Sequence, residues 1–194
     1  MHKLSQVVKK YRTPRQVQKF LRSLPYNRDE NKPTLRSANQ SLAAGKAHCF
    51  EGALLAAAIL EQHGYPPLVM SFESLDQLDH VIFVFRYKGR WGAVARSRDE
   101  GLHGRAPVFR SMRDLAWSYY EPYIDKTGMI YAYQVAHLDD TKSDWRDSKK
   151  NVWKAEKYLL EIKHRPLMSS KKRYKKIKKR YLKNGPMKNK KNWW

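Results

Sequence analysis

The chain has 194 residues, of which 40 are Lys or Arg and 18 are Asp or Glu, so its formal net charge is +22. A hydrophobic content of 41% with 12 Tyr and 6 Trp fits one ordinary domain and argues against a wholly disordered basic protein. The single cysteine excludes an intrachain disulfide framework and a cysteine-based zinc finger. The longest apolar run, 53–60, is far below the roughly 20 residues that span a bilayer. The N-terminus has no apolar segment typical of a secretory signal, so we expect a cytoplasmic location.

The positive charge is concentrated in the two flanks of the chain. Residues 1–48 carry a net charge of +9, residues 49–140 carry −3, and residues 141–194 carry +16. The last 26 residues contain 12 basic and no acidic side chains. A block of like charge of this kind is typical of an interaction tail. The flanks therefore indicate where a partner binds, and the middle segment carries most of the apolar pattern of a folded core.

Two helices are predicted in the first third of the chain. The first follows Thr13, which has N-cap chemistry, with Pro14 at the first helical position and apolar residues at helical spacing through Leu24. The second, over 49–63, is dense in Ala and Leu, and Gly64 follows it as the expected stop.

Strands and two further helices are predicted after this point. The predicted strands cover 68–73, 80–87, 91–96 and 129–135. A tight turn at 88–90 makes the middle two a hairpin, and 101–107 is predicted to be a loop. Ser111 opens a helix with Asp114 at the capping-box position, and 149–163 is predicted to be helical. Helices followed by an antiparallel hairpin sheet predict an α+β fold.

Three segments are expected from this pattern. Residues 1–140 form the folded domain. Residues 141–168 form a helical extension, and 169–194 form a basic tail that is either disordered or helical.

Cys49 and His80 are the candidate reactive pair. A thiol at a helix N-terminus feels the positive end of the helix dipole, which favours the thiolate. Backbone N–H groups that are free at the same place can hold an oxyanion. A thiolate nucleophile needs a proton acceptor, most often His, and His80 begins a strand 31 residues later. A small buried cysteine and a structural histidine would give the same pattern.

The stretches GKAHCFEGALLAAAILEQHGYPPLVMSF and DHVIFVFRYKGRWGAVARS resemble the transglutaminase-like superfamily, which shares the papain-like arrangement of cysteine proteases. The shared pattern is a Cys opening a long helix, a His opening a strand and a Gly-x-Trp hairpin turn, here Cys49, His80 and Gly89-Arg90-Trp91. The stretch GLHGRAPVFRSMRDLAWSYYEPY resembles an uncharacterised bacterial branch of that superfamily. The resemblance covers about 21–136 and implies a Cys49 nucleophile, a His80 base and a protein or peptide amide substrate.

The sequence departs from the family at the third catalytic position. The family usually has an Asp four residues after the hairpin Trp, where this chain has Ala95. Ser97 and Asp99 are the nearest candidates to orient the imidazole of His80. Asp79 precedes His80 and would face the opposite side of a regular strand. The resemblance therefore implies an incomplete or rearranged triad.

Other residues near Cys49 have weaker signals. His48 is expected to be a loop residue or to tune the site, and Glu51 to stabilise the helix dipole. Gln40 is a distant candidate for an oxyanion donor. The seven His are scattered, so neither a metal nor another cofactor is predicted.

The basic tail supports an alternative function. Over 171–183, Tyr174, Ile177 and Tyr181 lie at i, i+3 and i+7 in a cationic surround, which suits an anionic polymer or surface if helical. Two hypotheses follow. The first is a thiol-dependent acyl transferase or amide hydrolase. The second is a catalytically decayed transglutaminase-like scaffold that binds nucleic acid or another anionic partner through its basic flanks.

Overall fold

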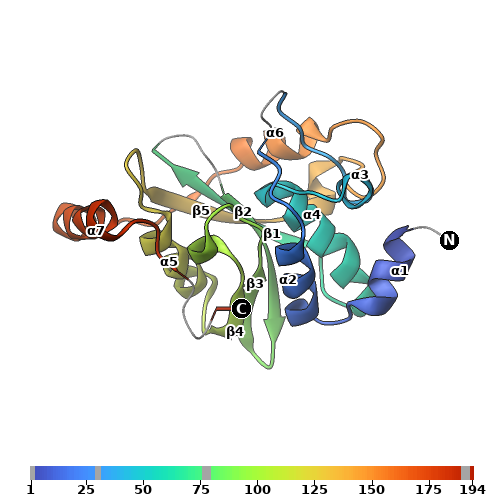
Figure 1. Ribbon diagram of the computed structural model, residues 1–194, viewed down its shortest axis with the longest axis horizontal. Helices are drawn as coiled ribbons and strands as arrows, with labels where there is room; N and C mark the ends of the chain where they lie inside the picture. Colours follow the sequence, from blue (N-terminus) through green and yellow to red (C-terminus); the bar gives the residue numbers. More distant parts are fainter. Residues whose placement is uncertain (1–2, 29–31, 76–79, 189–192) are drawn as a thin grey trace.

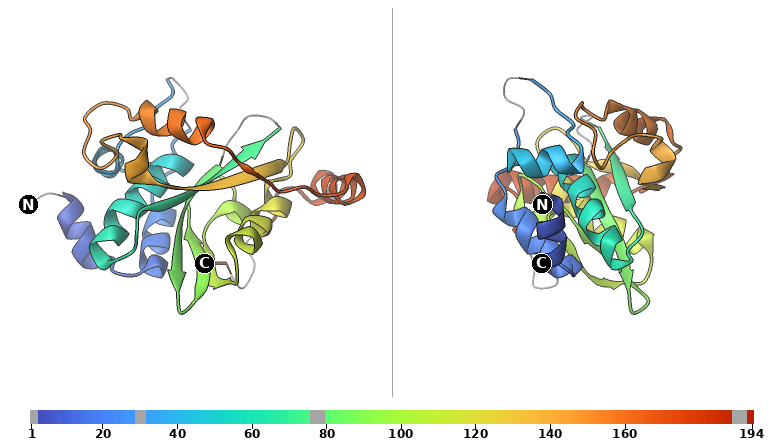
Figure 2. Two further views of the ribbon diagram at one scale, coloured as in Figure 1. Left: turned by 180° about the vertical axis from the view of Figure 1, so that it is seen from behind. Right: turned by 90° about the vertical axis from the view of Figure 1, so that its right-hand side faces the viewer.

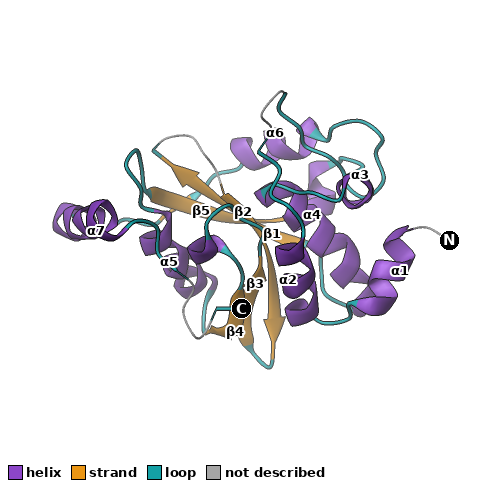
Figure 3. Ribbon diagram, in the orientation of Figure 1, coloured by secondary structure: helices purple, strands orange, loops and turns teal. Residues whose placement is uncertain are grey.

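The computed structural model describes residues 3–28, 32–75, 80–188 and 193–194. The helices are α1 (Lys3–Lys10), α2 (Pro14–Ser23), α3 (Ala38–Ala44), α4 (Cys49–Leu60), α5 (Met112–Tyr123), α6 (Trp153–Glu161) and α7 (Lys171–Asn184). The strands are β1 (Leu68–Ser74), β2 (His80–Tyr87), β3 (Arg90–Val94), β4 (Arg105–Phe109), β5 (Ile130–His137) and β6 (Arg165–Pro166). They form one antiparallel sheet in the order β4-β3-β2-β1-β5-β6, with helices on both sides (Figure 3). The predicted α+β class, with the cysteine-bearing helix packed on an antiparallel sheet, is confirmed.

Both faces of the sheet are buried, which explains the continuous apolar run of β2. Val81, Phe83 and Phe85 face a core that contains α2, α3, α4 and α6. Ile82 and Val84 face a second core formed with α5 and α7. Figure 1 shows α2 and α4 on one side of β2 and β3, and α5 on the other. Alternate residues of a strand point to opposite faces, so a strand covered on both sides needs apolar residues at every position.

The central helix α4 brings Cys49 to the end of the sheet. It is buried along almost its whole length, which fits a helix that is apolar on all sides. Gly52 allows its first turn to approach closely, because a Cβ at this position would lie 2.7 Å from the Cβ of Arg96. The α-helix ends at Leu60, continues as a 3₁₀ turn, and stops at Gly64 with φ of +82°. The predicted stop at this glycine is confirmed.

Several elements differ from the sequence-based expectation, among them α1 and β6, which were not predicted. Residues 101–107, predicted to be a loop, contain a short 3₁₀ turn (Glu100–Leu102) and the first part of β4. Pro107 obscured this strand, and it fits here because β4 lies at the edge of the sheet. The helix α3 was not predicted, although Ser37 caps it by accepting a hydrogen bond from the Gln40 N–H.

The C-terminal third packs on the rest of the chain. Trp145, Val152, Ala155 and Leu159 belong to the α4 side of the core. The helix α7 extends from the body of the molecule, and Ile177 on its inner face is buried (Figure 2). The domain boundaries at 140 and 168 stay predictions. In the part of the chain that the structure describes, no helix has the length and apolar character needed to cross a membrane.

Candidate active site

A cleft of about 860 Å³ opens where the N-terminus of α4 meets the first residue of β2. Cys49 and His80 both line it. Its other walls come from the segments around residues 26–28, 97–99 and 122–125, and from α6. Tyr181 and Pro186 of the C-terminal region complete the rim. The two residues singled out from the sequence therefore lie together in one open cavity.

Two histidines hold the Cys49 thiol. Burial raises the pKa of this thiol, but hydrogen bonds to His48 and His80, together with the charges of both rings, outweigh burial and hold the pKa well below its usual value. The helix dipole acts in the same direction, because Cys49 is the first residue of α4. The site therefore favours a thiolate with two imidazoles against it.

The His80 ring is held by a main-chain carbonyl. Its Nε2 atom lies 3.0 Å from the oxygen of Leu102, which requires Nε2 to carry a proton. The other nitrogen, Nδ1, is then the one that faces Cys49. The ring is buried beside the aromatic rings of Phe72 and Tyr119, at centroid distances of 6.2 and 5.9 Å. A main-chain carbonyl is thus the described hydrogen-bond partner of Nε2.

His48 contacts the cysteine rather than serving only as a loop residue. Its Nε2 atom lies 2.8 Å from the oxygen of Thr34. Burial lowers the pKa of His48, but the hydrogen bond with Cys49 and the charges of Cys49 and Glu51 outweigh it and raise the pKa to about 9. In the neutral ring, Nδ1 caps the helix by accepting the Phe50 N–H at 3.2 Å. The protonated ring has an N–H at both nitrogens and cannot accept this bond.

Glu51 is a buried anchor for the loops around the cleft. Its carboxylate is fully buried and lies 3.2 Å from the Arg36 guanidinium. It also accepts hydrogen bonds from the side chains of Asn27 and Thr34 and from the main chain of Arg36 and His48. The predicted effect on the helix dipole is thus one part of a larger role. The spacing of His48 and Glu51, that of a capping box, was the available signal.

Tyr26 lies against the main chain of Cys49, a contact that no sequence motif indicated. Burial, followed by the charge of the Cys49 thiolate, raises the pKa of Tyr26 well above its ordinary value, while a hydrogen bond with the Cys49 backbone opposes this rise. A parallel bridge to Ala47 fixes the Tyr26 backbone. Gln40 lies on α3 and is absent from the described residues that line the cleft.

Ser97 and Asp99 line the cleft and shape the loop that carries Leu102. The Ser97 hydroxyl accepts the Asp99 N–H at 3.2 Å, and the Asp99 carbonyl accepts the Leu102 N–H at 3.1 Å. Ala95, at the position of the family's Asp, is buried, and Gln18 bonds both its N–H and its carbonyl. A direct role for Ser97 or Asp99 on the imidazole stays a prediction. Asp79 lies outside the described residues.

Within the described residues, no group of three His, Cys, Asp or Glu side chains could hold a metal ion.

Comparisons with known proteins add a likeness of fold only. No protein-family model and no curated protein matches the sequence. Among solved structures, the chain is similar to calcium-bound LapG of Legionella pneumophila, with a TM-score of 0.44 and 11% identity over 82% of this chain and 87% of that one.

Proposed function

We propose that the protein is a thiol-dependent enzyme that acts on amide bonds of proteins or peptides, either as a hydrolase or as an acyl transferase. Cys49 is the nucleophile and His80 is the acid–base residue. The observation that carries this proposal is the thiol of Cys49 hydrogen-bonded to His80, whose Nε2 atom is fixed 3.0 Å from the Leu102 carbonyl, in an open cleft. A nucleophile, a base and an orienting group in this relation are the working parts of acyl-transfer sites.

The reaction begins with attack of the Cys49 thiolate on the amide carbonyl. A carbon–sulfur bond forms, and the carbonyl oxygen becomes an oxyanion beside the Cys49 N–H at the start of α4. The Tyr26 hydroxyl lies at the same N–H and remains protonated, so it can supply a second hydrogen bond. His80, whose Nδ1 atom took the proton of the Cys49 thiol when the thiolate formed, then gives that proton to the leaving nitrogen; the carbon–nitrogen bond breaks, and an acyl-thioester remains on Cys49.

The second half-reaction regenerates the enzyme. His80 takes a proton from water or from an amine, which attacks the thioester carbonyl and releases the sulfur as a thiolate. Water gives hydrolysis, and an amine gives transfer of the acyl group. The cleft volume of about 860 Å³ is within the usual range for ligand sites.

Reactivity of the thiol tests this proposal without a known substrate. Iodoacetamide should alkylate Cys49 at pH 7 faster than it alkylates a free-cysteine peptide, because a thiolate is the reacting form. The protein is then incubated with an unfolded substrate protein and a fluorescent alkylamine. Mass spectrometry of the products detects cleavage, deamidation or amine incorporation. The Cys49→Ala protein should lose every such product. Alkylation no faster than that of the peptide would contradict an activated thiolate.

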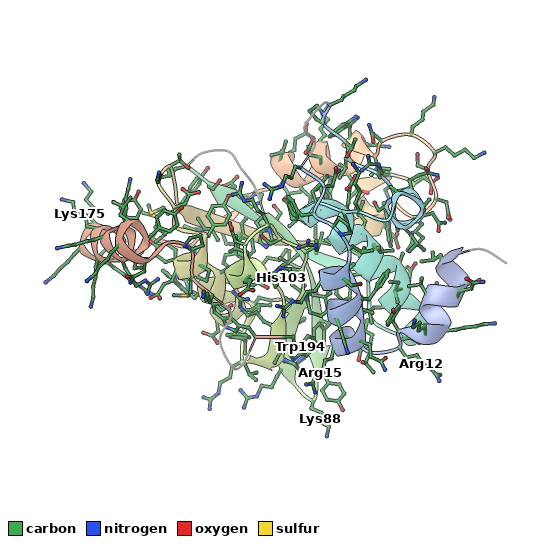
Figure 4. The ribbon with its side chains drawn as sticks, viewed as in Figure 1. Arg12, Arg15, Lys88, His103, Lys175 and Trp194 are labelled. Atoms are coloured by element: carbon green, nitrogen blue, oxygen red, sulfur yellow. The ribbon has the colours of Figure 1, made fainter. Side chains whose placement is uncertain are left out.

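A second candidate function rests on α7, and we propose that this helix binds an anionic partner such as nucleic acid. Nine of its 14 residues are basic. Tyr174 and Ile177 pack toward the body, while most of the lysines are exposed, and Figure 4 labels Lys175 on the outer end of the molecule. The apolar stripe predicted from the sequence is thus partly covered by the protein, and the cationic surface faces solvent.

Retention on heparin and on a single-stranded RNA oligonucleotide tests this second function. Replacing Lys175, Lys176 and Lys179 by Gln should weaken retention and reduce its dependence on salt, because fewer counterions are released. Cys49→Ala is the matched control and should bind as the unaltered chain does. Equal retention of the triple variant would contradict binding through α7.

A further inference from the structure

Arg105 is a buried arginine whose described partners include no carboxylate. Its side chain is fully buried at the start of β4, and its guanidinium donates five hydrogen bonds. Two of these reach the hydroxyl and carbonyl oxygens of Ser118, at 3.1 and 3.2 Å. Burial lowers the pKa of this guanidinium to about 10. A buried cation is costly unless its surroundings satisfy it, so these contacts mark a specialised position.

The remaining bonds of Arg105 go to the loop that carries Leu102. The guanidinium donates to the carbonyls of Gly101 at 2.7 Å, His103 at 2.7 Å and Gly104 at 3.1 Å. The fourth carbonyl of this run, that of Leu102, accepts from His80 at 3.0 Å. One buried arginine therefore fixes the three carbonyls that flank the carbonyl contacting the candidate base. Figure 4 shows His103, in the middle of this loop, at the centre of the molecule.

Two aromatic rings from distant parts of the chain cover the guanidinium. Its carbon lies 3.9 Å from the ring centroid of Tyr119 in α5 and 3.6 Å from that of Trp193 near the C-terminus. Cation–π contacts of this kind are strongest when the cation is removed from water. The C-terminal segment also packs directly on the loop, because a Cβ on Gly101 would clash with the Met187 carbonyl.

We propose that Arg105 is a positioning residue of the candidate site. Its guanidinium, covered by the ring of Trp193, acts as a clamp on residues 101–104. Arg105 holds the loop so that the Leu102 carbonyl keeps the His80 ring in its Nε2–H form, with Nδ1 turned to Cys49. This inference rests on the proposed function of Cys49 and His80. In this arrangement the group that orients the imidazole is a neutral carbonyl instead of the carboxylate that the resemblance implies. The direction of that carbonyl depends on the Arg105 guanidinium, which bonds the neighbouring carbonyls.

Three variants test this proposal. Arg105→Lys keeps the charge but has too few directed donors to hold three carbonyls. Trp193→Ala removes one covering ring, and Trp193→Phe restores it. Arg110→Lys, an exposed arginine just after the same strand, is the matched control. The readouts are the pH profile of Cys49 alkylation, the ¹⁵N spectrum of the His80 ring and the melting temperature.

We expect Arg105→Lys to move the midpoint of the alkylation pH profile upward by about one unit, which is a tenfold change in the ionisation constant of the thiol. The Nε2–H signal of His80 should weaken in parallel. Trp193→Ala should move both readouts in the same direction by less, Trp193→Phe should restore them, and Arg110→Lys should leave them unchanged.

Unchanged ring spectra and alkylation profiles in a folded Arg105→Lys protein would overturn the proposal. If that variant does not fold, unchanged readouts in a folded Trp193→Ala protein overturn it instead. The ring spectrum separates this failure from failure of the proposed function. An ordinary thiol pKa in the unaltered chain would reject the function, while the His80 signal would still report whether Arg105 orients the ring.

Discussion

The two histidines that contact Cys49 lie in opposite kinds of surroundings. His48 lies in an ionic network, 3.8 Å from the buried carboxylate of Glu51. His80 lies between aromatic rings and bonds a neutral carbonyl. A buried carboxylate stabilises the protonated form of a neighbouring imidazole, and such a carboxylate lies beside His48. In the proposed reaction His48 therefore holds the thiolate, and His80 exchanges the proton.

Removing each ring in turn gives the largest expected contrast. His80→Ala should lower kcat for a peptide amide about 10²–10⁴-fold, because the proton donor is lost. His48→Ala should lower it much less at pH 7 and should move the acid limb of its pH profile upward by about one unit, because loss of the ring raises the thiol pKa and leaves the proposed acid–base residue in place. Turnover of both variants by mass spectrometry checks this. Equal losses would remove the division of labour between the two rings.

The ionic network around His48 should contribute more to the free energy of unfolding than the aromatic surroundings of His80. Glu51→Ala leaves Arg36 and several loop groups without their buried acceptor, so we expect the free energy of unfolding to fall by about 3–5 kcal/mol. Urea denaturation measures this loss. The matched change of Glu156→Ala, at an exposed acid that lines the same cleft, should cost far less. A similar cost for both acids would mean that Glu51 is an ordinary surface-like charge.

The pairing of the thiolate with His48 should make its contribution to the free energy of unfolding independent of pH over a limited range. The depressed pKa of Cys49 makes the thiolate contribution disappear as the pH falls through the folded-state pKa. The pKa of His48, raised from 6.5 to about 9, makes the imidazolium contribution disappear as the pH rises through about 9.

Between about pH 6.5 and 8.5 the folded pair and its unfolded counterpart bind the same number of protons. The stability difference between the unaltered chain and Cys49→Ala should therefore be flat over this range and smaller on both sides. Urea denaturation from pH 5 to 10 measures it. A difference that rises or falls steadily across the range would contradict the pairing.

The smallest effect is expected on the aromatic side. The Tyr119 hydroxyl donates to the His103 carbonyl at 3.0 Å, and that carbonyl also accepts from Arg105. Tyr119→Phe leaves no acceptor unpaired and keeps the ring beside His80, so the cost should be about 0.5–1 kcal/mol. Thermal unfolding checks it, with Tyr131→Phe as an exposed control. A loss of several kcal/mol would show that the hydroxyl itself supports the loop.

Sequence reasoning singled out Cys49 and His80, which lie in one cleft, but missed the groups that surround them. Cys49 and His80 carry side-chain chemistry that can be recognised in a pattern. The Leu102 carbonyl has no such signal, because every residue has a main-chain oxygen. His48 was discounted because it is adjacent to Cys49, yet a residue at the N-cap can fold its ring back over the first helical turn.

The errors in the fold have related causes. Gly104 and Pro107 indicate a loop by composition, but Gly104 directly precedes β4, and an edge strand accepts Pro107. The burial of β2 on two faces hides the alternation that marks a half-exposed strand, and its aromatic and β-branched content still identified it. Long-range contacts such as the clamp of Arg105 depend on tertiary structure and have no local pattern.

Glu51 also has a consequence for redesign of the cleft. Its carboxylate bonds Asn27 at one end and Thr34 and Arg36 at the other end of the same surface segment. A single buried group therefore joins two points of the chain, Asn27 and Thr34, and the cost of closing a loop depends only weakly on its length. Sequences of different length and charge could be exchanged between these anchors, which makes this rim a natural place to select new substrate preferences while Cys49 and both histidines stay fixed.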